Sequence, residues 1–175
     1  MTFKKDLITG LSKKNKTIPS KYHYDLQGSK YFEKITQQKE YYPTRKEKEI
    51  LRKLSKKIPL IFKGPLSFVE IGSGSVDKIK ILLNKKVKFY IPLDISLNFV
   101  KKSTSKLKKK YPKLKIKPIK IDYSKPFKIP KFKNTMKICF FLGSSIGNFH
   151  NKKEINFLKN IKKSIGKNNH LFVGV

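Results

Sequence analysis

The spacing of hydrophobic residues predicts that the chain begins with helices. Apolar side chains recur every three or four positions over residues 3–14, again after Gly28 and again after Thr44, which is the period of an amphipathic helix. Thr44 and Glu47 also form the T-x-x-E arrangement that is typical of a capping box at a helix N-terminus. We therefore expect a helical segment over residues 1–60, with its third helix starting at Thr44.

After that segment, short apolar runs alternate with helical patterns. The runs predict strands over residues 66–71, 87–93, 114–121, 136–142 and 170–175. The segments between them predict helices over residues 79–83, 96–110 and 151–165. Strands that alternate with helices imply right-handed crossovers and a parallel sheet covered on both faces. We therefore expect an α/β fold, in which residues 61–175 form a Rossmann-like, doubly wound parallel sheet after the N-terminal helical segment.

Two of these segments also predict which side chains face the core. In residues 114–121 isoleucine and lysine alternate with the period of a strand, which favours an edge strand with one solvated face. In the last predicted helix, Ile155, Leu158, Ile161 and Ile165 are expected to face inward.

The last predicted strand continues to Val175 without a turn or a cap. Doubly wound domains usually place further elements after their fifth strand. We therefore expect the chain to be a fragment whose sheet lacks its C-terminal strands.

The net charge adds a competing interpretation. The chain has 43 lysine and arginine residues against 11 acidic ones, a formal charge of +32, and basic surfaces bind nucleic acids. Only Arg45 and Arg52 are arginine, however, and alanine is absent, a pattern typical of an AT-rich genome. Nucleic-acid interfaces favour the bidentate guanidinium of arginine. We therefore attribute the charge mainly to composition, while a basic protein that acts on or binds nucleic acid stays open as the alternative.

Cysteine usage and hydropathy predict a cytoplasmic protein. Cys139 is the single cysteine, which excludes a disulfide framework and fits a reducing compartment. No run of about 18 apolar residues is present, and the N-terminus lacks the apolar stretch of a signal peptide. We expect no membrane association.

Candidate chemistry begins at a glycine-rich turn after the first predicted strand. In open parallel sheets, ligands bind beyond the carboxyl ends of the strands. This strand carries Glu70 one residue before its end, and the turn that contains Gly72 and Gly74 follows it. The third glycine of a dinucleotide fingerprint is missing, because Asp77 stands there, which argues against an NAD enzyme. An acid directly before the glycines favours a ligand with a cationic head group, such as S-adenosylmethionine.

Acids also close the next two predicted strands. Asp94 ends the second, where an acid can bind both ribose hydroxyls, although a surface-turn aspartate is the alternative. Asp122 and Tyr123 end the third, where the carboxylate can accept a hydrogen bond from an adenine amine and the ring can cover the base. An Asx turn is the alternative for Asp122. Together with Gly72, these residues follow the class I methyltransferase layout.

Sequence strings make the resemblance more specific. They occur in this order: YDLQGS at 24–29, EYYPTR at 40–45, EIGSGS at 70–75, IPLDIS at 91–96 and FLGSSIGN at 141–148. Together they resemble the histidine N-alpha-methyltransferases of ergothioneine biosynthesis. The resemblance covers almost the whole chain but only about the first half of the family's length.

That resemblance implies a Rossmann-like class I methyltransferase that uses S-adenosyl-L-methionine to trimethylate the alpha-amine of L-histidine, giving hercynine. It implies that Gly72 and Lys78 contact the amino acid end of the cofactor. It also implies that Asp94 binds the ribose, and that Asp122 and Tyr123 bind the adenine.

The resemblance further implies that Tyr41 and Asn148 hold the histidine substrate. A second lobe of the family supplies acidic and aromatic substrate contacts, and those positions lie beyond Val175. No catalytic side chain and no metal are expected, because methyl transfer mainly needs the donor aligned with a neutral amine. We expect a small-molecule partner, no specific nucleic acid and a monomer at full length. Another amino acid or amine as the substrate stays open, and so does a basic nucleic-acid methyltransferase or binding module.

Overall fold

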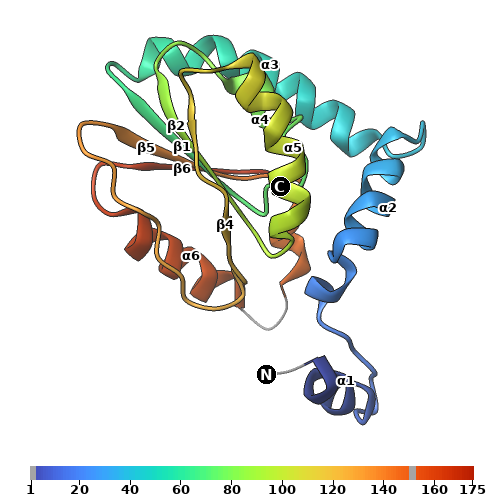
Figure 1. Cartoon of the computed structure of the whole chain (residues 1–175). Coiled ribbons are helices and arrows are strands. Elements are labelled where there is room, and N and C mark those ends of the chain that lie inside the picture. Colours follow the sequence, from blue (N-terminus) through green and yellow to red (C-terminus); the bar gives the residue numbers. More distant parts are fainter. Residues whose placement is uncertain (1–2, 150–152) are drawn as a thin grey trace.

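The computed structural model describes residues 3–149 and 153–175, and its beginning is helical as predicted (Figure 1). The elements there are α1 (Phe3–Leu11), a 3-10 turn η1 (Ser20–His23), α2 (Leu26–Gln37) and α3 (Tyr42–Ile61). Asp25 caps α2, because its carboxylate accepts a hydrogen bond from the Gly28 amide at 2.7 Å.

The predicted start of α3 at a Thr44 capping box is wrong. The helix begins at Tyr42, directly after Tyr41, and no side chain caps it. Pro43 lies in the first turn, where its fixed φ favours the helix and its missing N–H has no intrahelical partner to lose. Thr44 is buried inside the helix, and the Glu47 carboxylate contacts the end of a strand instead of the helix N-terminus.

The remainder forms one sheet with helices between its strands. The strands are β1 (Leu66–Ile71), β2 (Val87–Asp94), β3 (Lys115–Ile116), β4 (Ile119–Lys120), β5 (Met136–Phe141) and β6 (His170–Val173). The order across the sheet is β3-β2-β1-β5-β6, and β4 also pairs with β2. Every pair is parallel, which confirms the prediction. The first strand along the chain therefore lies at the centre, beside β2 and β5.

The predicted edge strand over residues 114–121 lies at the edge of the sheet but is split into β3 and β4. Pro118 stands between the two pieces and has no N–H to donate to β2. The amides of Lys117 and Ile121 still donate to the carbonyls of Tyr90 and Asp94, each at 2.9 Å. The segment therefore follows β2 to its carboxyl end in spite of the break.

Helices cover both faces of the sheet, which confirms the doubly wound arrangement. They are α4 (Ile79–Leu82), α5 (Leu97–Lys110) and α6 (Lys153–Ile165), together with α3. On one face, α3, α4 and α5 pack through Ile58, Ile79 and Leu107 against a cluster that contains Phe68. On the other face, α6 packs against a cluster that contains Val69. Successive β1 residues thus point to opposite faces, as a pleated strand requires.

The predicted inward face of α6 is partly wrong. Ile161 and Ile165 are buried as expected and Leu158 is partly buried, but the Ile155 side chain is 46% exposed. Phe157 is buried in its place, because it lies one helical turn before Ile161 and continues the same face. Residues 151 and 152, where the helix was predicted to begin, lie outside the described residues.

Candidate functional site

The glycine turn after β1 has a backbone shape that only glycine adopts easily. Gly72 and Gly74 have φ angles of +66° and +50°, in the left-handed region. The Gly72 amide donates to the Leu93 carbonyl at 2.8 Å, which ties the turn to the end of β2. A Cβ built on Gly74 would meet nothing within 4 Å. The turn is therefore fixed on one side and open on the other.

Asp94 lies directly beside this turn, as the sequence predicted. Its Oδ2 accepts a hydrogen bond from the Gly74 amide at 2.9 Å, and its Oδ1 accepts one from the Ser96 amide at 2.8 Å. The residue is 8% exposed, so it is not the solvated turn aspartate of the alternative interpretation. Each carboxylate oxygen can accept about two hydrogen bonds, so each retains capacity for one hydroxyl of a ligand.

Asp122 and Tyr123, which follow β4, lie beside the ends of β1 and β2. The Ile121 amide donates to the Asp94 carbonyl at 2.9 Å, which places the next two residues beside β2. A Cβ built on Gly72 would lie 3.3 Å from Cε1 of Tyr123. The prediction that the glycine turn, Asp94 and the Asp122-Tyr123 pair lie together is confirmed.

Asp122 also makes the local turn that was considered as its alternative role. Its Oδ1 accepts hydrogen bonds from the amide and the hydroxyl of Ser124, at 3.1 and 2.5 Å, while Lys21 Nζ lies 3.6 Å from Oδ2. Partial burial opposes ionisation of this carboxyl, but the Ser124 hydrogen bonds and the Lys21 charge outweigh it and lower its pKa. The carboxylate is therefore held ionised, with one oxygen less engaged than the other.

Aromatic contacts hold the Tyr123 ring in place. It packs against Phe141, Phe149 and Phe157, with ring centroids 5.5, 6.2 and 5.7 Å away. Burial raises the pKa of its hydroxyl to about 12. Since the ring is held from three sides, its position beside Gly72 is set by the core.

Glu70 does not take the position that the sequence suggested. It was expected to face a cationic ligand, but it is only 2% exposed and its Oε2 accepts a hydrogen bond from the buried Tyr90 hydroxyl at 2.5 Å. Burial raises its pKa to about 8, against the opposing effects of the Tyr90 hydrogen bond and the Lys78 charge. Its side chain belongs to the core under the glycine turn.

Lys78 pairs with a residue that sequence reasoning did not assign to the site. Its Nζ lies 2.6 Å from Oε2 of Glu47, and Oε1 of Glu47 accepts a hydrogen bond from the Gly143 amide at 2.6 Å. The T-x-x-E pattern of Thr44 and Glu47 was interpreted as a capping box, in which Glu47 would contact only residues near it in the sequence. Its actual partners are distant in sequence, and no local pattern marks them.

Tyr41 and Asn148 lie on other segments. Tyr41 is half-buried and its ring makes an edge contact with Phe32 at 6.1 Å between centroids. Asn148 is exposed at the end of a 3-10 turn, η2 (Ser145–Asn148), which follows β5. Gly143, at the beginning of the same connection, contacts Glu47. Their predicted role in substrate binding stays a prediction.

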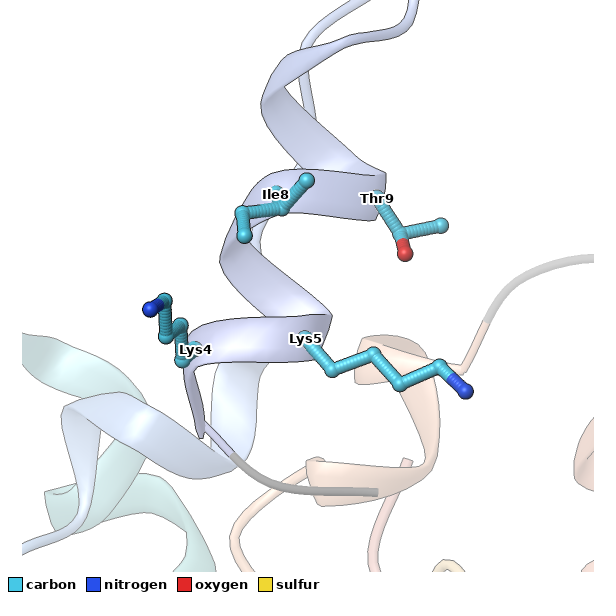
Figure 2. Close-up of a pocket in the computed structure, with 4 residues that line it drawn as sticks. All are labelled: Lys4, Lys5, Ile8 and Thr9. Atoms are coloured by element: carbon cyan, nitrogen blue, oxygen red, sulfur yellow. The ribbon is translucent and has the colours of Figure 1, made fainter.

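Two surface hollows lie away from these strand ends. A hollow of about 370 Å³ on α1 is lined by Lys4, Lys5, Ile8 and Thr9, whose side chains spread outward from one helix (Figure 2). Another of about 280 Å³ is lined by Gly64, Pro65, Lys85, Lys86 and Lys88. Ligand sites usually gather convergent polar groups from several elements. The strand ends have that arrangement and these two hollows do not.

Other kinds of site find no support in the described part of the chain. Within residues 3–149 and 153–175, no three His, Cys, Asp or Glu side chains gather as a metal site. No helix in those ranges has the length and apolarity to cross a membrane. Cys139 is a free, buried cysteine in β5, and burial raises its pKa to about 12, which keeps the thiol unreactive.

A parallel sheet with a glycine turn after its central strand, and acids after the next two strands, defines the class I methyltransferase fold. A solved structure of a SAM-dependent methyltransferase from Leishmania major shares this fold, with a TM-score of 0.50 at 14% identity. The match covers 72% of this chain and 49% of that protein.

The family follows from the sequence comparison. Residues 3–175 match the model of the SAM-dependent, histidine-specific methyltransferases, and the chain belongs to that family. It is 31% identical to the histidine N-alpha-methyltransferase of Mycolicibacterium smegmatis, over 98% of this chain and 54% of that enzyme. It is also 34% identical to a 4-dimethylallyltryptophan N-methyltransferase of Epichloe festucae, over 51% of this chain and 28% of that enzyme. The chain thus spans about half the length of its M. smegmatis relative.

Proposed function

We propose that the chain is the cofactor-binding part of an S-adenosylmethionine-dependent N-methyltransferase that methylates the alpha-amine of L-histidine to hercynine. The observation that carries this proposal is the meeting of Gly72, Asp94 and the Asp122-Tyr123 pair at three strand ends. The family match supports the substrate class.

The arrangement fits the adenosyl part of the cofactor residue by residue. The free acceptor sites of the Asp94 carboxylate suit the two ribose hydroxyls. Asp122 carries an ionised carboxylate for the adenine amine, beside the fixed ring of Tyr123. The backbone at Gly72 and the ammonium of Lys78 suit the amino acid end, where the ligand has a carboxylate.

The proposed roles divide the chain in two. Residues 61–175 bind the cofactor and carry Asn148, and residues 1–60 contribute Tyr41 to the binding of the substrate. When bound, S-adenosylmethionine would supply a methyl group on a sulfonium, whose electron pair stays on sulfur as the methyl carbon bonds to the amine nitrogen. Hercynine would require three such transfers, with a proton released from the nitrogen to water after each of the first two. The protein groups are then needed to align the two partners, and no acid or base from the chain is required for the bond change.

Calorimetric titration with S-adenosylhomocysteine tests cofactor binding. Asp94→Asn should weaken binding about thirtyfold, because the variant loses the charge that accepts the ribose hydrogen bonds. Asp77→Asn is the matched control, since Asp77 is an aspartate of the same turn that is 49% exposed and pairs only with Lys80. Separate titrations with NAD and with an oligonucleotide test the two alternative ligands. Failure of the unmodified protein to bind S-adenosylhomocysteine would refute the proposal.

A second substrate can be compared directly, because a relative named as a 4-dimethylallyltryptophan N-methyltransferase is 34% identical over 51% of this chain. Incubation with S-adenosylmethionine and either L-histidine or 4-dimethylallyltryptophan, followed by mass spectrometry, measures the preference. Methylated histidine supports the first proposal. Methylation of the tryptophan derivative alone would replace it with the second.

A further inference from the structure

The Glu47 carboxylate links α3 to two segments of the candidate site. One oxygen accepts a hydrogen bond from the Gly143 amide and the other contacts Lys78 Nζ, both at 2.6 Å. The side chains of Glu47 and Lys78 are only 16% and 20% exposed. Charge-assisted hydrogen bonds that are screened from water are stronger than those on the surface. The contact therefore restrains all three groups.

Two glycines leave the space that this contact occupies. A Cβ built on Gly143 would lie 2.8 Å from Lys78 Nζ, and one built on Gly174 would lie 2.7 Å from Glu47 Oε1. Both distances are too short for a real side chain. A side chain at either position would have to displace the end of Lys78 or Glu47, so the two glycines leave room for the ion pair in its observed position.

The exposed ion pairs of the same region lack these features. Glu49 lies on the same helix and pairs with Lys46, but the two side chains are 53% and 66% exposed. Asp77 and Lys80 are 49% and 40% exposed. Such surface pairs contribute little, since water and salt screen them. Of these three pairs, the one formed by Glu47 links α3 to the glycine turn's Lys78 and to the connection after β5.

We infer that Glu47 is a positioning residue for the cofactor site, acting through Lys78 and the Gly143 amide. Lysine has a long, flexible side chain that loses rotamer freedom when it binds a ligand. Glu47 removes much of that freedom in advance, while the ammonium keeps further N–H donors for a ligand carboxylate. The same carboxylate fixes the start of the connection that carries Asn148. This inference rests on the proposed function.

Calorimetry with S-adenosylhomocysteine on a set of variants tests the inference. Glu47→Gln should weaken binding about tenfold, because the amide keeps one hydrogen bond but loses the charge that holds Lys78. Glu49→Gln, two positions further along the same helix, is the matched control and should bind like the unmodified protein. Circular dichroism melts of each variant monitor the fold.

A double-mutant cycle separates positioning from general stabilisation. If Glu47 acts through Lys78, then Glu47→Gln should cost no further affinity in the background of Lys78→Met. A purely structural role predicts that the loss is the same in both backgrounds, and this result overturns the inference. So does unchanged or tighter binding by Glu47→Gln alone. If the unmodified protein does not bind S-adenosylhomocysteine, the proposed function itself fails, which distinguishes the two failures.

Discussion

Replacing Glu70 by glutamine should change how the stability of the protein depends on pH. The Glu70 carboxyl is 2% exposed and accepts a hydrogen bond from the Tyr90 hydroxyl. Burial raises its pKa from 4.5 to about 8. The folded state therefore keeps this carboxyl protonated at pH values where the unfolded chain ionises it.

The sign follows from the proton balance. The folded state binds the extra proton between pH 4.5 and about 8, so this contribution to stability is fully present below pH 4.5 and is lost as pH rises toward 8. The loss amounts to about 1.4 kcal/mol per pH unit, and about 5 kcal/mol over the whole interval as an upper value. Glutamine has the same shape, keeps an acceptor for Tyr90 and does not titrate, so Glu70→Gln should remove this slope.

Urea unfolding followed by circular dichroism at several pH values between 5.5 and 8.5 measures the effect, since the chain has no tryptophan to report by fluorescence. The unmodified protein should lose stability steadily with rising pH, and the variant should lose much less. Glu49→Gln, whose side chain is 53% exposed, is the control and should follow the unmodified protein. Parallel curves for Glu70→Gln and the unmodified protein would show that Glu70 ionises normally, and the reasoning would be refuted.

Three further predictions concern the glycine turn, the Tyr123 ring and the net charge of the chain. Gly72→Ala should destabilise the fold by about 2 kcal/mol in urea unfolding and more than Gly74→Ala, because both have positive φ but only position 72 adds a close approach, 3.3 Å to Tyr123. Equal losses would contradict the contact. Tyr123→Phe should keep S-adenosylhomocysteine affinity within about twofold, since the ring and not the hydroxyl packs in the aromatic cluster; a large loss in calorimetry would assign a role to the hydroxyl. Oligonucleotide binding, measured by fluorescence anisotropy, should fall at least about a hundredfold between 50 and 200 mM salt, as non-specific binding does; binding that survives would revive the nucleic-acid alternative.

The fold was largely predictable because its signals are local. The limits of β1 agree with the apolar run Leu66–Ile71, and the glycine turn follows it directly. Carboxyl ends of parallel strands meet at one edge of a sheet. An acid at the end of each of two neighbouring strands therefore had to lie beside the glycine turn, as Asp94 and Asp122 do.

Side-chain partners were less predictable. Hydrophobic spacing showed that α6 is amphipathic but assigned Ile155 to the buried face, where the structure places Phe157. The T-x-x-E string suggested a local role for Glu47, because that spacing is a signature of a capping box. The structure instead begins α3 at Tyr42, with Pro43 in its first turn, and the Glu47 carboxylate contacts Gly143 and Lys78.

The sequence by itself determined the order of elements, the class of the fold and the residues that line the strand ends, since each depends on neighbours along the chain. Only the tertiary structure decided that Glu70 turns into the core and that Glu47 reaches Gly143, 96 positions away. The physical reason is that burial and charge pairing depend on which surfaces meet after folding. No spacing rule within one helix or strand contains that information.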